Sequence, residues 1–156
     1  MSFVVVLLAL VACTQSPSAL STPDVAIPPS ALNGDVRVYT PEGWNTFRVN
    51  DPIGLAIEVA GAEEIAFPAD YGVRMFLAGQ ERWREVPNVP GETGAGWILS
   101  PSSGDPLRFG ATTVFPVVED VEGPVLLRIY VIGHYLREGQ VEDEEVAGFV
   151  EVTLEP

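Results

Sequence analysis

Short runs in which apolar and polar residues alternate dominate residues 35–156, and this period of two constrains the fold more than any other feature of the chain. The run over residues 53–59 has branched apolar side chains at every second position, which places them on one face of an extended strand. No stretch of this region repeats apolar residues with the spacing of an amphipathic helix. The sequence therefore predicts an all-β domain.

Strands are predicted where such runs are bounded by proline, glycine or asparagine. The expected strands cover residues 36–39, 53–59, 71–77, 82–86, 97–99, 107–109, 112–118, 125–132 and 146–154. Residues 78–81 suit a hairpin loop because of their length and glycine content. Residues 133–145 are expected to form a long loop, which is where sheet proteins usually place a binding surface.

A series of about eight or nine short strands without a convincing helix resembles the immunoglobulin-like antiparallel β-sandwich found in many bacterial surface lipoproteins. The resemblance implies two packed sheets over residues 35–156. The inter-sheet disulfide of antibody domains is absent, because the chain has a single cysteine. A jelly roll or a small β-barrel is the alternative architecture.

The amino-terminal segment predicts export and lipid attachment. Residues 3–12 form an unbroken run of ten apolar residues that ends at Cys13. Such a run is too short to cross a bilayer, which takes about 20 residues, but it suits the apolar region of a signal peptide. The sequence Leu10-Val11-Ala12-Cys13 resembles the lipobox of bacterial lipoproteins. The resemblance implies cleavage between Ala12 and Cys13 and acylation of Cys13; the alternative is a buried strand that ends in a core cysteine.

Residues 13–34 are expected to form a flexible tether between the lipid and the domain. They are rich in serine, threonine and proline and carry a single charge, Asp24. Prolines remove backbone donors that helices and sheets need, and the apolar residues of this stretch have no period. A coil of this length would place the domain roughly 25 Å from its anchor. The alternative is a first edge strand around residues 25–27.

Charge and composition exclude several classes of function. Eight arginines, no lysine and 22 acidic residues give a net charge of -14, which repels nucleic acid. Without lysine the chain cannot form a Walker A phosphate site or a Schiff base with a cofactor. One histidine and one cysteine cannot form a Cys/His zinc site. We therefore expect no bound cofactor and no such metal centre.

Aromatic side chains are the candidates for ligand binding. Trp44, Trp83 and Trp97, with Tyr71 and Tyr135, would form a carbohydrate-stacking platform if two or three of them were exposed on one face. Aromatic residues of β-domains more often pack in the core. Trp83 lies between two arginines, whose guanidinium groups can cover an exposed ring.

Carboxylates and the histidine are weaker candidates. The run Glu142-Asp143-Glu144-Glu145 could bind calcium, but its spacing matches no EF-hand loop and a solvated acidic loop is the favoured interpretation. A hydrolase would need a carboxylate pair of fixed separation. Its candidates are Glu58, Glu63, Glu64 and Asp70. His134 could make a pH-sensitive contact beside the acidic loop; the alternative is a solvated loop residue.

These features predict a non-catalytic binding or scaffolding module, anchored by lipid to the bacterial cell envelope and facing the extracytoplasmic side. The expected partners are the membrane, through Cys13, and another envelope protein. A carbohydrate-binding module that recognises a polysaccharide is the first alternative, and a small envelope hydrolase is the second.

Overall fold

The computed structural model describes residues 26–48, 51–69, 72–77, 81–86, 96–101, 106–112 and 123–155. These residues form ten strands and one short 3-10 helix, η2 (Pro29–Ala31). The strands are β1 (Val36–Tyr39), β2 (Thr46–Arg48), β3 (Pro52–Val59), β4 (Glu64–Phe67), β5 (Gly72–Leu77), β6 (Arg82–Val86), β7 (Trp97–Leu99), β8 (Leu107–Thr112), β9 (Val125–Arg137) and β10 (Gln140–Glu155). The signal segment, Ala12, Cys13, Asp70, Tyr71 and most of the strand predicted over 112–118 lie outside the described residues.

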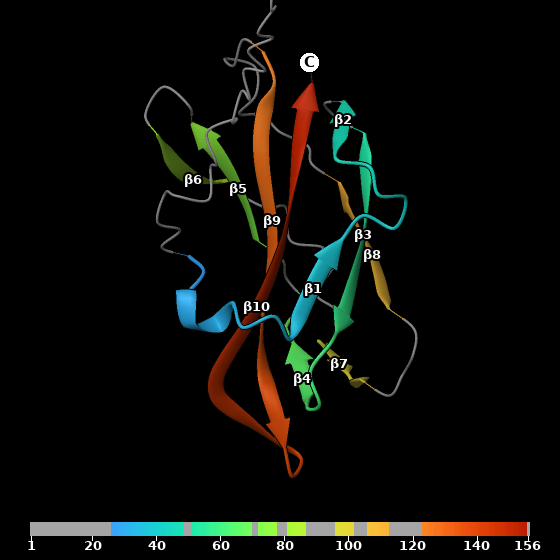
Figure 1. Ribbon diagram of the computed structural model, residues 1–156, viewed down its shortest axis with the longest axis vertical. Coiled ribbons are helices and arrows are strands. Elements are labelled where there is room, and N and C mark those ends of the chain that lie inside the picture. Colours follow the sequence, from blue (N-terminus) through green and yellow to red (C-terminus); the bar gives the residue numbers. More distant parts are fainter. Residues whose placement is uncertain are drawn as a thin grey trace, which may run out of the picture.

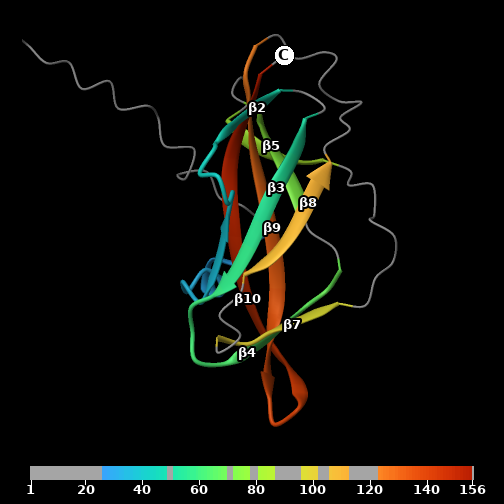
Figure 2. The ribbon, with the colours of Figure 1, turned by 90° about the vertical axis from the view of Figure 1, so that its right-hand side faces the viewer.

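The strands form two sheets that pack face to face (Figures 1 and 2). The three-stranded sheet A has the order β1-β3-β8. The seven-stranded sheet B has the order β2-β10-β9-β4-β7, with β5 also pairing with β9 and β6 pairing with β5. The β2–β10 pair is parallel, and the other described pairs are antiparallel. The prediction of an all-β sandwich is confirmed, and the immunoglobulin-like strand order stays a prediction.

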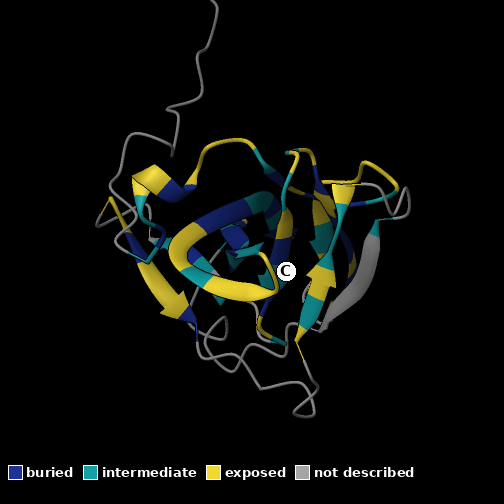
Figure 3. Ribbon diagram, turned by 90° about the horizontal axis from the view of Figure 1, so that it is seen from below, coloured by how far each residue is buried: buried dark blue, intermediate teal, exposed yellow. Residues whose placement is uncertain are grey.

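The core lies between the sheets, where Figure 3 shows buried segments in dark blue. The inward faces of β3, β9 and β10 supply most of it. One cluster contains Ile53 and Leu55 of β3 against Leu127 and Ile129 of β9. A second cluster, toward the hairpin end, contains residues such as Ile57, Ile65, Val131 and Val146. The period-two pattern read in residues 53–59 thus marks the face that is buried, because alternate side chains of a strand share a face.

The segment between the last two predicted strands differs from the sequence-based prediction of a long loop. Residues 133–145 do not form a long loop, because β9 extends to Arg137 and β10 begins at Gln140. A two-residue turn joins them, and both Glu138 and Gly139 have positive φ, at 53° and 78°. Such values are typical of the type I′ turn, whose twist matches that of paired strands. The resulting hairpin projects beyond the body of the sandwich (Figures 1 and 2).

The described part of the expected tether is not the flexible coil that the sequence predicts. Residues 26–34 pack on the outer face of sheet B, where Ile27 and Ala31 are each only 1% exposed. Their neighbours are Ala147 and the half-buried side chains of Tyr130, Ile132 and Phe149. Residues 26 and 27 form a turn and a bend rather than the edge strand considered as the alternative. Composition predicts a flexible coil here because it does not report tertiary packing of this kind.

Candidate binding groove between β1 and β10

The candidate aromatic residues do not come together. Trp44, in the segment between β1 and β2, is 65% exposed, whereas Trp83 on β6 is only 8% exposed. Trp97 on β7 is half-buried and packs against the second core cluster. Tyr135 on β9 is buried. Of the three tryptophans, Trp44 alone is available to stack on a sugar, and no platform is assembled among the described residues.

Trp83 has a structural role instead. The guanidinium carbon of Arg128 lies 4.3 Å from the ring centroid of Trp83 and 4.3 Å from that of Phe149. Arg128 also pairs with Glu151, with Nη2 at 2.7 Å from Oε1. This stack joins β6, β9 and β10 across the outer face of sheet B and leaves Arg128 only 3% exposed. A planar guanidinium suits this position, because it stacks on aromatic rings and donates hydrogen bonds in its plane.

The three candidate carboxylates that the structure describes, Glu58, Glu63 and Glu64, each contact another side chain. Glu63 accepts hydrogen bonds at 2.7 and 2.8 Å from Nε and Nη2 of Arg137, and these bonds hold the pKa of its carboxyl below the ordinary value. Glu64 accepts a hydrogen bond from Ser100, and Glu58 pairs with Arg37 at 3.8 Å. Such pairing is typical of surface ion pairs.

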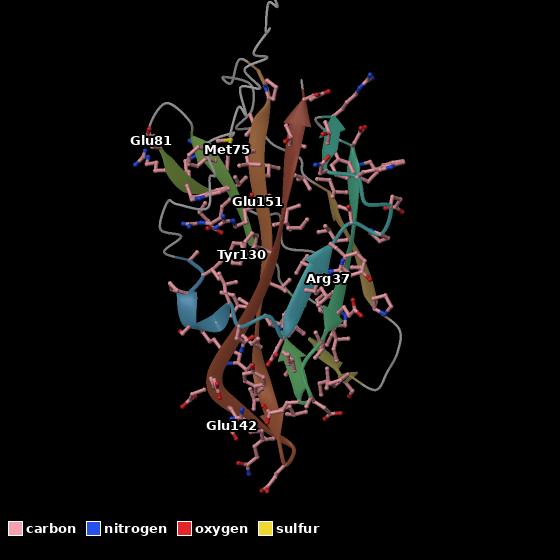
Figure 4. All side chains as sticks on the ribbon, viewed as in Figure 1. Arg37, Met75, Glu81, Tyr130, Glu142 and Glu151 are labelled. Carbon is pink, nitrogen blue, oxygen red and sulfur yellow. The ribbon has the colours of Figure 1, made fainter. Side chains whose placement is uncertain are left out.

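The acidic hairpin has no metal-binding geometry in the described residues. Two extra residues on β10 form a bulge between Val141 and Glu145, and Figure 4 labels Glu142 near the projecting end of the hairpin. Nδ1 of His134 lies 3.1 Å from the carbonyl oxygen of Glu142. A carbonyl only accepts, so Nδ1 carries the proton in this contact. No group of three or more His, Cys, Asp or Glu side chains is placed to hold a metal ion in the described part of the chain. His134 was predicted to lie in a loop. It lies in a strand instead, because β9 extends to Arg137.

The structure instead shows an apolar groove of about 370 Å³ along the line where sheet A meets sheet B. Segment 32–38 and Ala60 form one side, and β10 forms the other. The lining residues are Leu32, Gly34, Val36, Arg37, Val38, Ala60, Ala147, Gly148 and Phe149. The volume falls within the range of ligand pockets, and the lining is mainly apolar with one charge at Arg37.

Gly148 sets the floor of this groove. A Cβ atom built on Gly148 would lie 2.7 Å from the carbonyl oxygen of Val36, so any other residue would push the two strands apart. Glycine within a strand often marks such a close approach of another backbone. β1 therefore crosses directly over β10 at this point.

The β10 side of the groove is an edge of that strand with which no strand of the described residues forms a ladder. The amide of Thr153 donates to the carbonyl of Asn45 at 2.7 Å, which places the main-chain groups of Thr153 on the side away from β9. Successive residues of a strand direct these groups to opposite sides, so those of Ala147, Phe149 and Glu151 point the same way. β2 pairs with β10 only at residues 153–155. Among the described strands, none pairs with this edge from Ala147 to Glu151, which we call the bare edge of β10.

The facing edge of β1 likewise forms no ladder with a described strand. The amide of Ala60 donates to the carbonyl of Asp35 at 2.8 Å, so Asp35 and Arg37 direct their main-chain groups toward β3. Val36 and Val38 then direct theirs toward β10. No described strand pairs with β1 on that side.

Sequence reasoning missed this site. The available signal was Gly148 inside the apolar stretch of residues 146–150, since a glycine within a strand indicates close backbone approach. The groove also depends on residues 32–34, which composition had assigned to the tether. Comparison with protein-family models, with curated proteins and with solved structures returned no match. No helix in the described residues is long and apolar enough to cross a membrane.

Proposed function

We propose that this chain is a lipid-anchored, extracytoplasmic and non-catalytic module that binds another protein at the bacterial cell envelope. The groove beside the bare edge of β10 is the observation that carries the binding role. It combines an apolar surface with main-chain donors and acceptors, a combination that proteins use to recognise polypeptides. Glu63 and Glu58 are each paired with an arginine, which does not favour a hydrolase.

Lipid attachment at Cys13 is supported by the apolar run of residues 3–12 and by the lipobox-like sequence that follows. The protein should remain with membranes until detergent is added, and its first peptide should begin at an acylated Cys13. A Cys13→Ala chain should lose the acyl mass and leave the membrane fraction. Thr14→Ala is the matched control and should behave as the unchanged protein. An unmodified Cys13 in membrane-extracted protein would refute the anchoring.

The binding role is tested by cross-linking in intact cells, followed by detergent extraction of the lipidated full chain. One protein partner in about equal molar amount is expected, because an open strand edge binds one segment at a time. The purified partner should then bind the purified chain directly. Failure to recover any partner, or a recovered protein that does not bind the purified chain, would refute the proposal.

Polysaccharide binding is a second candidate, and the 65% exposure of Trp44 favours it. A single stacked ring gives weak affinity, so binding should be lost in Trp44→Ala and retained in Trp83→Phe. Affinity electrophoresis in gels that contain cell-wall polysaccharide measures this directly. Equal mobility of the three chains would eliminate the candidate.

A further inference from the structure

The outer face of sheet B carries an apolar strip that stays exposed at the hairpin end. Paired residues of neighbouring strands share a face of the sheet, as do alternate residues of one strand. The pairing of β7, β4, β9 and β10 therefore brings together four apolar residues, which we call the outer strip: Ile98, Ala66, Leu136 and Val141. The two end residues, Ile98 and Val141, are each 60% exposed. Such exposure at neighbouring apolar positions indicates a surface for a partner.

The strands that carry the outer strip are held by the core behind it. Ile65 of β4, Trp97 of β7 and Tyr135 of β9 all pack in the second core cluster, on the opposite face of the sheet. β4, β7 and the β9–β10 hairpin lie at the same end of the molecule in both side views (Figures 1 and 2). The outer strip is therefore built on packed strands and not on loops.

Further along the same face, the chain covers the sheet with its own residues. Ile27 and Ala31 pack with Ala147 of β10 and with the half-buried Ile132 of β9. Ile132 lies four residues before Leu136, so both side chains point to the same face. The short helix η2 thus covers one part of this face, and the outer strip continues beyond it. A helix packed on a sheet face is a common layer arrangement in proteins.

We propose that the outer strip binds a basic amphipathic helix of another protein, with the apolar side of the helix on the strip and its basic side chains beside the carboxylates of the hairpin. The inference goes beyond the proposed function, because none of the four residues of the outer strip lines the groove. It therefore assigns a second binding surface to the chain.

Carboxylates around the strip determine the charge of its partner. Residues 137–145 include five acidic residues and a single arginine, and that arginine, Arg137, is already bonded to two carboxylates. Glu145 is exposed and pairs with His134, so its side chain lies on the face of the strip. The net charge of -14 also repels a second copy of this chain. A basic segment is attracted by the same field.

The length of the strip matches about three turns of helix. Ile98 and Val141 lie on strands three places apart in the sheet, and their rows are two residues apart along the strands. Strand spacing of about 4.8 Å and a rise of about 3.4 Å per residue separate them by roughly 16 Å. A helix that rises about 1.5 Å per residue covers this distance in about 11 residues. Apolar residues spaced by three and four would then lie along the whole strip.

The probe is a blocked peptide of about 15 residues, long enough to form a helix, with leucine at helical spacing and lysine or alanine elsewhere. One control peptide has the same composition in an order that scatters the leucines around the helix. The other has glutamate in place of lysine. Each peptide is added to the full chain in a non-ionic detergent, and hydroxyl-radical labelling with mass spectrometry reports the exposure of individual side chains.

The basic amphipathic peptide should lower the labelling of Ile98 and Val141 by about threefold or more, because a packed helix excludes solvent from both. Labelling of Trp44 should not change, since Trp44 lies near β2, at the end of the sandwich away from the hairpin (Figure 1). Neither control peptide should protect the strip. Equal protection by either control, or protection confined to residues outside the strip, would overturn the proposal.

Ile98→Ser combined with Val141→Ser tests the apolar contact from the side of the protein. Both residues are largely exposed, so the fold should tolerate the change. Peptide affinity should fall about tenfold or more. The matched control, Ile98→Val with Val141→Ile, exchanges the two side chains and should bind as the unchanged chain. Unchanged affinity in the folded serine variant would overturn the proposal. If that variant does not fold, the labelling of the unchanged chain with the three peptides decides the question.

Asp143→Asn combined with Glu145→Gln tests the charge. Peptide affinity should fall about threefold at low salt and depend less on salt, because two carboxylates near the basic side chains are neutralised. Glu81→Gln is the matched control, since Figure 4 shows Glu81 at the end of the molecule away from Glu142. An equal loss of affinity in both chains would show that only the net charge matters and would overturn binding at the hairpin.

The two proposals fail independently. If an envelope partner is recovered but the basic peptide does not protect the outer strip, this inference is wrong and the proposed function stands. If the peptide binds the strip but no envelope partner is recovered, the reverse holds. If Ile98 and Val141 lose labelling as the chain is concentrated without peptide, a second copy covers the strip and the basic partner is wrong.

Discussion

Replacing Tyr135 by phenylalanine should detach residues 33–35 from β9. The Tyr135 hydroxyl donates to Oδ2 of Asp35 at 2.8 Å and accepts from Nδ2 of Asn33 at 2.6 Å. The side chain is only 3% exposed, so water does not readily replace either partner. The ring itself would stay in place in Tyr135→Phe, and the two hydrogen bonds would be lost.

The magnitude follows from the two bonds. A bond between neutral groups contributes about 1 kcal/mol and one to a carboxylate about 1.5 to 3 kcal/mol. Asp35 is half-buried and can regain some water, which reduces the loss. We expect Tyr135→Phe to lower the free energy of unfolding by about 2 kcal/mol, equivalent to about 4 to 8 °C in Tm for a chain of this size.

Urea unfolding followed by tryptophan fluorescence measures this change, with the slope against urea expected to stay constant. The matched control is Tyr39→Phe, because the Tyr39 hydroxyl makes no hydrogen bond in the described structure and its loss should change stability by less than about 0.5 kcal/mol. The double variant with Asn33→Ala should lose less than the sum of the single losses, since the residues share a bond. Equal stabilities of the two tyrosine variants would refute the reasoning.

Two further predictions follow from the outer face of sheet B. Ile27→Ala should lower the free energy of unfolding in urea by about 2 to 4 kcal/mol, because Ile27 is fully buried. Leu32→Ala, at a residue 40% exposed, should lower it by less than about 1 kcal/mol. Equal losses would place residues 26–34 outside the folded unit. Burial, with the nearby Glu85 carboxylate, raises the pKa of Tyr130 from 10.0 to about 12. The fold therefore favours the neutral phenol, so this contribution to stability is complete below pH 10 and is lost as pH rises toward 12. Tyr130→Phe should remove that part of the alkaline loss, and an unchanged pH profile would contradict the assignment.

The elements predicted correctly from sequence are those in which the local pattern and the burial agree. Residues 53–59 form β3 with the alternate face buried, and residues 72–77 and 82–86 pair as expected. Hydrophobic alternation is sufficient there because it reports directly which face meets the core. β4 was not predicted, since its four residues lie between acidic and proline-containing segments.

The sequence-based predictions were wrong where the composition of a segment did not indicate its tertiary contacts. Residues 26–34 have the composition of a linker, but Ile27 and Ala31 fit against Ala147 on a sheet formed more than one hundred positions later. The acidic run of residues 142–145 has the composition of a solvated loop, yet a projecting hairpin also exposes its side chains to water. Solvation of side chains therefore does not distinguish a loop from an exposed strand.

The candidate site illustrates a more general limit. Alternation tells which side chains of β10 face inward, but every residue except proline offers the same backbone donor and acceptor at the edge of a strand. Whether that edge is covered depends on the length of its neighbour, and β2 has three residues beside a strand of sixteen. Only Gly148 carries a trace of the arrangement in sequence, because its missing side chain lets the Val36 carbonyl approach. An unpaired edge can thus be found only after the pairing of distant segments is known.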